Sequence, residues 1–357
     1  MADAEEHQCQ DKDDRHIPYP ETPQFDYFRK AFLKGDHESY CLDLFGTVKI
    51  HGTNIALVFT NTDAPCQIQS RNRILSLQSD AYHCYKTLSQ KPLKDLVEQI
   101  SKIHVSPWTD IMIVGEWAGK GVQKGVGISE IDPKILVIFN IRIDQKWEDI
   151  RKYRDVAIRN HRIYSICDFP TYNITIDLKN LKDVERADKE MEDLVAVIDK
   201  KCPVAAYFGI DGPGEGIVYT YINREPRQHL YNFKVKGEAH QIVKKPKVMQ
   251  PKDSSLMQSV AAFVEYCITP ARLDQGLSYL EEMGKPVDSK STGIYIRRVV
   301  LDALKEEGHT LEERNLKEKD VKQALTSAVR KGWEIRLKAA LRETSRVTLL
   351  MNDLSID

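Results

Sequence analysis

The stretch Lys49-Ile50-His51-Gly52-Thr53-Asn54 decides how this chain is expected to fold and to act. Short apolar runs lie on both sides of it, between residues 40 and 71, and glycines such as Gly46 and Gly52 divide them. Short runs separated by such breakers predict antiparallel strands. We therefore expect a meander in which Lys49 lies in a polar turn between two strands.

A lysine in such a turn can act as a nucleophile toward phosphorus if desolvation or neighbouring cations lower the pKa of its amine. The Lys-x-x-Gly pattern alone is weak evidence, because it occurs at four further positions, and context must choose among them. These positions begin at Lys124, Lys234, Lys290 and Lys305. An ordinary surface lysine is the alternative for Lys49, so other residues must support the catalytic interpretation.

The sequence between residues 26 and 243 predicts a mixed α+β domain with antiparallel strands and flanking helices. Helices are expected over Leu77–Ile103, Glu148–Arg159 and Lys182–Lys200. Further strands are expected over Ile111–Trp117, Ile135–Ile143, Gly216–Ile222 and Leu230–Lys236.

A linker and a separate helical domain are predicted to follow. Residues 244–253 contain four lysines and two prolines without a usable period, which is typical of a linker. Residues 254–357 have apolar positions at helical spacing and hardly any strand character, so we expect an all-helical C-terminal domain. Its helices are expected over Ser254–Cys267, Pro270–Met283, Gly293–Glu307 and Lys317–Arg342.

Composition excludes several classes of protein. With 41% hydrophobic and 29% charged residues, the chain is typical of a soluble globular protein, and no apolar run is long enough to span a membrane. The seven cysteines are odd in number and form no C-x-x-C pair, which argues against structural zinc and a disulfide framework. Residues 1–25 begin with a polar, acid-rich stretch that has no secretory signal, so we expect a disordered tail on an intracellular protein. Because the net charge is −1, any nucleic-acid surface must come from local clustering of cations.

Two glutamates next to glycines are candidate site residues. Glu116 ends an apolar strand and precedes a glycine-rich loop, where a carboxylate suits a ribose hydroxyl or a metal ion. Glu215 lies among glycines immediately before the strand that begins at Gly216. A solvated strand end for Glu116 and a simple hairpin turn at Glu215 are the alternatives.

Cations and one aromatic residue complete the candidate site. Lys234 and Lys236 are two residues apart and would share a strand face, where they could bind phosphates. Arg71 and Arg73 would share a face in the same way and could grip a phosphate, although a charged edge strand is the alternative. Phe139 could stack on a purine ring, but it could also be simply a core residue.

In their order along the chain, these segments resemble the motifs of ATP-dependent nucleotidyltransferases. Lys-Ile-His-Gly-Thr-Asn at 49–54 and Gly-Glu-Trp-Ala-Gly at 115–119 are similar to those of the RNA ligase 2 branch, which includes phage T4 nick-sealing and trypanosome RNA-editing ligases. The resemblance implies a nucleotidyltransferase domain of the ATP-grasp-like ligase type. Asn140 and Tyr219 depart from the branch, which commonly has aspartate and lysine at these positions.

The resemblance also implies a role for each candidate. Lys49 would be the nucleophile that carries AMP, with Glu215, Lys234 and Lys236 assisting catalysis. ATP would be bound by these four residues together with Ile50, Asn54, Arg71, Glu116 and Phe139. Glu215 and Glu116 would be associated with Mg²⁺ or Mn²⁺, and His51, Asn54 and Arg71 with the RNA ends and the sealing steps.

The implied activity is ATP-dependent RNA ligation in RNA repair or processing, at nicks or paired breaks, by a monomer. A GTP-dependent capping guanylyltransferase and a non-catalytic RNA-binding protein on the same fold are the alternatives. RNA is expected to contact two basic stretches, in the linker and on the last helix. These comprise Lys244, Lys245, Lys247 and Lys252, and Arg330, Lys331, Arg336 and Lys338.

Overall fold

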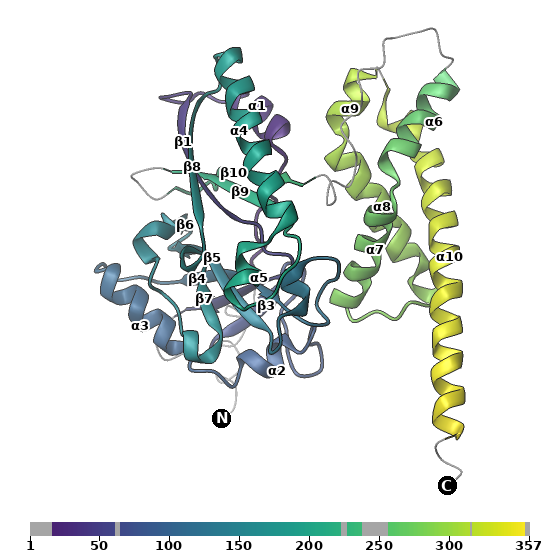
Figure 1. The fold of residues 1–357 in the computed structure, drawn as a ribbon, viewed down its shortest axis with the longest axis horizontal. Coiled ribbons are helices and arrows are strands. Elements are labelled where there is room, and N and C mark those ends of the chain that lie inside the picture. Colours follow the sequence, from purple (N-terminus) through teal and green to yellow (C-terminus); the bar gives the residue numbers. More distant parts are fainter. Residues whose placement is uncertain (1–15, 61–64, 223–226, 238–255, 315, 354–357) are drawn as a thin grey trace, which may run out of the picture. The chain divides into compact units, whose positions relative to one another are not determined.

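The chain divides into two compact units, Met1–His240 and Gln241–Asp357. The structure is a computed structural model that describes residues 16–60, 65–222, 227–237, 256–314 and 316–353. The first unit combines antiparallel sheets with flanking helices, and the second is helical in its described part (Figure 1). The predicted fold class is therefore confirmed.

A four-stranded antiparallel sheet forms one half of the first unit, in the order β10-β9-β1-β8. Its strands are β1 (Cys41–Val48), β8 (Thr171–Asp177), β9 (Gly216–Tyr221) and β10 (Asn232–Lys236). Helix α4 (Leu181–Lys200) lies against β8, β9 and β10. Helix α1 (Phe25–Lys34) packs Phe25 and Phe28 on Phe233, with ring centroids 4.9 Å apart for both pairs.

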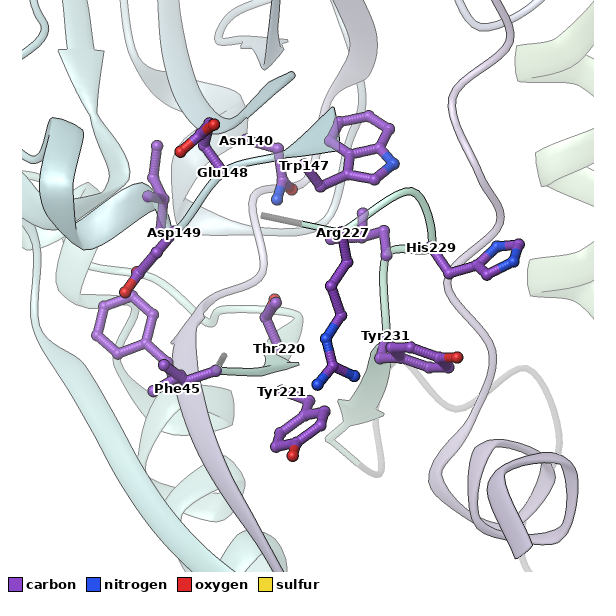
Figure 2. Close-up of a pocket in the computed structure, with 13 residues that line it drawn as sticks. Phe45, Asn140, Trp147, Glu148, Asp149, Thr220, Tyr221, Arg227, His229 and Tyr231 are labelled. Atoms are coloured by element: carbon purple, nitrogen blue, oxygen red, sulfur yellow. The ribbon is translucent and has the colours of Figure 1, made fainter. Parts of the chain in front are cut away.

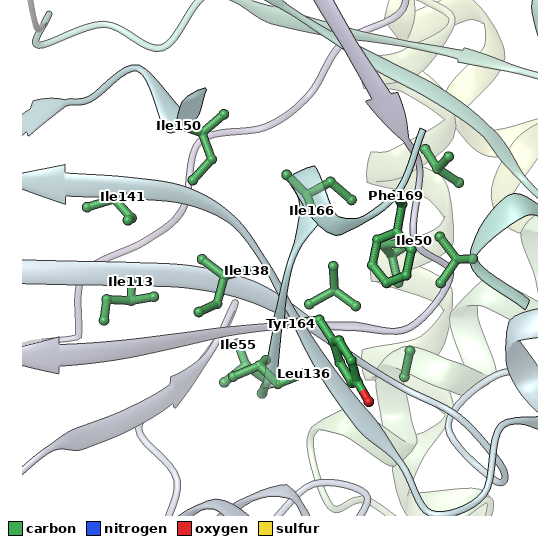
Figure 3. Packing of buried hydrophobic residues seen from close by; sticks show 14 of the residues in the cluster. Ile50, Ile55, Ile113, Leu136, Ile138, Ile141, Ile150, Tyr164, Ile166 and Phe169 are labelled. Carbon is green, nitrogen blue, oxygen red and sulfur yellow. The ribbon is translucent and has the colours of Figure 1, made fainter. Parts of the chain in front are cut away.

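A second sheet forms the other half, in the order β3-β2-β4-β5-β6, and β7 pairs in parallel with β5. Its strands are β2 (Thr53–Phe59), β3 (Gln67–Ser70), β4 (Ile111–Ala118), β5 (Ile135–Ile143), β6 (Lys146–Trp147) and β7 (Ile163–Ser165). One face of β2, β4 and β5 contributes isoleucines and leucines to the main core (Figure 3). Every residue of β2 is buried, because its other face is covered as well.

The predicted meander is wrong in one respect. β1 pairs with β8 and β9, whereas β2 pairs with β3 and β4, so the turn that starts at Lys49 passes from one sheet to the other. Gly46 does not interrupt β1, which runs through it. Apolar runs buried on both faces carry no periodicity that identifies their partners, and only the assembled sheets determine them.

Two predicted helices are also corrected. The stretch Leu77–Ile103 forms two helices, α2 (Cys84–Leu88) and α3 (Lys94–Ile103), because Pro92 between them cannot donate a helical hydrogen bond. Glu148–Arg159 contains only the 3₁₀ turn η2 (Ile150–Tyr153), and η3 (Arg159–His161) begins where the prediction ended. By contrast, the helix predicted over Lys182–Lys200 and the four later strands are present. Shorter elements of this unit are η1 (Gly127–Glu130), η4 (Ile166–Asp168) and α5 (Pro203–Tyr207).

The segment between His16 and Phe25 is ordered, contrary to the predicted tail boundary at residue 25. The Ile17 amide donates to Gln69 Oε1 at 3.1 Å, and Tyr19 is only 7% exposed. The acid-rich first half of the predicted tail lies outside the described residues. Its composition concealed the short run Ile17-Pro18-Tyr19-Pro20, which packs on the second sheet.

The C-terminal unit has its own hydrophobic core. Its helices are α6 (Leu256–Cys267), α7 (Pro270–Glu282), η5 (Ser289–Ser291), α8 (Thr292–Glu306), α9 (Gly308–Glu313) and α10 (Glu318–Asp353). Four of them match the predicted helices, and α9 was not predicted. Arg272 is buried in this unit and forms ion pairs with Asp302, Glu306 and Glu307. The predicted linker, residues 244–253, lies outside the described residues.

No helix in the described part of the chain combines the length and the apolar composition that crossing a membrane requires.

Candidate active site

The turn that carries Lys49 is fixed by backbone contacts to both sheets. The Lys49 amide donates to the Gly216 carbonyl at 2.8 Å, which joins the turn to β9. At Gly52, an added Cβ would lie 2.3 Å from the Trp117 carbonyl oxygen in β4. The glycine of the Lys-x-x-Gly pattern is therefore required here because the turn approaches β4 more closely than any side chain permits.

Glu215 is the centre of a charged cluster around Lys49. Its Oε2 lies 2.7 Å from Lys49 Nζ and 2.9 Å from His51 Nδ1, and its Oε1 lies 2.9 Å from Lys236 Nζ. The Glu215 side chain is 4% exposed, and Lys49 is 22% exposed. Burial would raise the pKa of Glu215, but Lys236, Lys49 and His51 hold it well below its usual range. Glu215 is therefore an anion that orients the Lys49 amine.

Glu116 lies directly opposite Asn54, where β2 and β4 pair. Burial of its carboxyl raises the pKa of Glu116 to about 7, against the opposing influence of Lys49 and Arg71, and the nearby Glu215 raises it further. The two glutamates thus differ, because both oxygens of Glu215 contact lysines and its pKa is lowered, whereas the pKa of Glu116 is raised. Glu116 is the carboxylate that a further cation would stabilise most.

The predicted arginine pair is placed differently from the expectation. β3 ends at Ser70, so Arg71 and Arg73 lie in the turn after the strand and do not share a strand face. The Ser70 amide closes this turn by donating to the Arg73 carbonyl at 2.8 Å. Arg71 lies close enough to Glu116 to lower its pKa. Arg73 instead donates through Nη2 to the Asp80 carbonyl at 3.1 Å. Arg71 therefore lies near Glu116, whereas Arg73 is held by the Asp80 carbonyl.

Phe139 is the extra residue of a β-bulge in β5. Val114 pairs with Asn140 and the next residue, Gly115, pairs with Ile138, so Phe139 has no partner in β4. Bulges re-aim side chains and are frequent beside active sites. The half-buried Phe139 contacts Tyr19 edge-to-face, with ring centroids 5.7 Å apart.

The structure brings most of the predicted residues together at the ends of the two sheets. Lys234 lies two residues before Lys236 in β10 and so shares its face, as predicted. Ile50 and Asn54 are buried on either side of Gly52. Sequence reasoning missed Tyr19 and Asn232, because no charge or glycine pattern marks them.

The glutamates fit a metal ion that arrives with a nucleotide. Within the described ranges, no group of three or more His, Cys, Asp or Glu side chains could hold a metal ion on its own. Mg²⁺ is commonly bound by one or two carboxylates together with substrate phosphates. Glu116, whose pKa burial raises to about 7, and its neighbour Glu215 meet that description.

Only some of the residues predicted to contact RNA are exposed in the described part of the chain. Arg330, Lys331 and Lys338 are exposed on α10. Arg336 is instead held by Asp274, with Nε 2.8 Å from Oδ1. The linker lysines lie outside the described residues. Tyr219, which stands where the RNA ligase 2 branch commonly has lysine, is fully buried.

Comparison with known proteins identifies the family of this chain. The sequence profile of the RNA ligase family matches residues 43–236, which is more than half of the chain. The chain therefore belongs to the RNA ligase family. The match begins in β1 and ends at Lys236, so it includes the Lys49 turn, both glutamates and the lysine pair.

No curated protein sequence matches the chain. Among solved structures, it is similar to those of an RNA ligase of Naegleria gruberi. A mutant with AMP and Mn has a TM-score of 0.40 at 12% identity, the form with PPi has 0.41 at 12%, and a mutant with ATP and Mn has 0.39 at 11%. In each case the match covers 63% of this chain and 57% of the other, so the chain spans less than two thirds of the Naegleria enzyme.

Proposed function

We propose that this protein is an ATP-dependent RNA ligase that joins RNA 3′-hydroxyl and 5′-phosphate ends through a lysyl-AMP intermediate on Lys49. The observation that carries the proposal is the cluster in which Glu215 holds Lys49, Lys236 and His51 within 2.9 Å. Membership of the RNA ligase family supports it. A binding protein would not require a lysine amine oriented by a buried carboxylate.

The first step forms a bond between Lys49 Nζ and the α-phosphorus of ATP and breaks the bond to pyrophosphate. The Lys49 amine attacks in its unprotonated form, and its proton passes to solvent, since the lowered pKa of Glu215 makes this carboxylate a poor proton acceptor. Lys236 and Lys234 lie on the strand next to Gly216 and balance the charge that develops on the phosphates. Arg71 and Phe139 bind the phosphate and the base.

Glu116 and Glu215 would hold Mg²⁺ or Mn²⁺ together with the ATP phosphates. The metal would supply positive charge against the α-phosphate and the pyrophosphate. We also propose that Glu116 accepts a hydrogen bond from a ribose hydroxyl, a role that the resemblance to RNA ligases implies.

The later steps consume RNA. An oxygen of the RNA 5′-phosphate attacks the phosphorus of lysyl-AMP, which frees Lys49 and forms an RNA adenylate. A 3′-hydroxyl then attacks the 5′-phosphate, and AMP leaves as the phosphodiester forms. His51, Asn54 and Arg71 are the candidates that position these ends. The exposed cations Arg330, Lys331 and Lys338 would bind the RNA backbone, and nicks or paired breaks in RNA are the proposed substrates for the monomer.

Two alternatives predict different results. A capping guanylyltransferase normally carries an oligonucleotide-binding β-barrel after its core, whereas the described residues beyond 255 form helices without a strand. A non-catalytic RNA-binding protein would not modify itself.

The test is incubation of the purified protein with Mg²⁺ and α-labelled ATP in the absence of RNA. We expect a label that survives denaturation, that pyrophosphate removes, and that Lys49→Ala lacks. The matched control is Lys290→Ala, which changes another Lys-x-x-Gly lysine, exposed in the C-terminal unit, and should label normally. An unlabelled wild type refutes the proposal, and labelling with GTP alone favours the capping alternative.

A further inference from the structure

Tyr19 lies on the same sheet face as the candidate nucleotide site. Asn54 and Glu116 form a cross-strand pair, and the next pairs along β2 and β4 are Ala56 with Val114 and Val58 with Met112. Residues two apart along a strand share a face, so all three pairs lie on one face. Tyr19 packs against the last two pairs. It therefore covers the continuation of the surface that begins with Glu116.

The other sheet reaches Tyr19 in the same way. Lys236, Lys234 and Asn232 alternate along β10 and share a face, of which Lys236 contacts Glu215. Asn232 Nδ2 donates to the Tyr19 hydroxyl at 3.3 Å. Asn232 and Lys236 are four positions apart, about 13 Å along an extended strand, so Tyr19 and the charged cluster contact separate positions on the same face of β10.

The Tyr19 hydroxyl joins the two sheets. It donates to Asn140 Oδ1 in β5 at 3.0 Å and accepts from Asn232 in β10. Burial raises the pKa of Tyr19, so the phenol stays neutral and remains a donor. Asn232 Oδ1 has no hydrogen-bond partner in the described structure, so its contacts with Tyr19 and Thr22 through Nδ2 are what hold this amide.

The Tyr19 ring contacts two aromatic residues, Phe139 and Trp147. It meets Phe139, the proposed base-stacking residue, edge-to-face at 5.7 Å, and Trp147 at 5.6 Å and 89°. Trp147 and Asn140 line a cavity between the sheets whose other walls include Phe45, Tyr221 and Arg227 (Figure 2). Tyr19 thus contacts both Phe139 and Trp147, one of the residues that line this cavity.

We propose that Tyr19 is a positioning residue for the adenine base: it holds Phe139 in the orientation that stacks on the ring and closes the side of the nucleotide site that faces the cavity. This inference rests on the proposed function, because it assigns a purine to Phe139. It adds the N-terminal segment 16–23 to the site, a segment that carries no ligase motif in the sequence and precedes the family match.

The test compares a ligand that has a base with one that has none. The KM for ATP is measured in Lys49 labelling, and the KM for pyrophosphate is measured in the reverse reaction, which removes the label. In Tyr19→Leu, we expect the KM for ATP to rise about tenfold, the magnitude of a lost aromatic contact, with kcat nearly unchanged. The KM for pyrophosphate should stay at the wild-type value, and Tyr19→Phe, which keeps the ring, should restore most of the ATP affinity.

The matched control is Phe28→Leu, which removes a buried ring packed on Phe233, on the face of β10 opposite to Asn232 and Lys234. It should change neither KM. The inference is overturned if Tyr19→Leu keeps the wild-type KM for ATP, if both KM values rise together, or if Phe28→Leu gives the same result. If Tyr19→Leu does not fold, Tyr19→Met replaces it. Failure of the wild type to label refutes the proposed function before any variant is compared, so the two failures are distinguishable.

Discussion

Replacing Glu116 with glutamine removes a carboxyl group whose pKa is raised, chiefly by burial, from 4.5 to about 7. Below pH 4.5 the group is protonated in both the folded and the unfolded chain and affects stability little. Between pH 4.5 and 7 the unfolded chain releases this proton while the folded chain retains it. The wild-type protein therefore loses stability as the pH rises through this window, and the neutral glutamine does not.

The size of the effect follows from the two pKa values. Each pKa unit corresponds to about 1.4 kcal/mol, so the full difference between 4.5 and about 7 amounts to at most about 3.5 kcal/mol above pH 7. Glu116 is half-buried by its accessible surface, and contact with solvent reduces the value. For a unit of this size, 3 kcal/mol corresponds to a change of roughly 6 to 12 °C in Tm.

The assay is thermal or urea unfolding without nucleotide, at a series of pH values from 4.5 to 8, followed by tryptophan fluorescence. The stability of Glu116→Gln relative to wild type should increase with pH and reach its plateau above pH 7. The control is Glu98→Gln, which removes a carboxylate from the exposed face of α3 and corrects for the general loss of one negative charge. A relative stability that does not change with pH, or that falls as the pH rises, would refute the argument.

Two further predictions concern contacts within each unit, one at Arg272 and one at Gly216. Arg272→Met removes a fully buried cation and leaves Glu307, which is 3% exposed, without this ion pair. The unfolding free energy of the C-terminal unit should therefore fall by about 3 to 5 kcal/mol, while Lys49 labelling persists. Urea unfolding that matches wild type would contradict this expectation. Gly216→Ala places a Cβ 2.1 Å from the Val235 carbonyl oxygen, at a φ of 147°. We therefore expect loss of β9–β10 pairing, measured by circular dichroism, and loss of Lys49 labelling. An alanine variant that labels normally would contradict this expectation.

The sequence alone indicated the residues that carry the proposed chemistry and most of the strands and helices, although the segment Glu148–Arg159 is not the helix that was expected. Lys49, Glu116, Glu215 and the lysine pair stand out because glycines and strand ends are marked by composition and period, which are local properties. The C-terminal helices were predicted for the same reason, since each has an apolar stripe at helical spacing. The candidate residues could therefore be located before any contact was known, and the resemblance to RNA ligases then implied their roles.

Only the tertiary structure decided how these segments meet. β1 and β2 flank the Lys49 turn but belong to different sheets, and the fully buried run of β2 has no alternation that would identify its partner strand. The bulge that frees Phe139 from pairing is set by the register of β4 against β5, which no local pattern specifies. Tyr19 reaches the site across more than a hundred residues of sequence through Asn140 and Asn232. Pairing, register and long-range contacts depend on the packing of the whole unit. For that reason the sequence indicated the candidate reacting groups, while only the fold determined which residues surround them.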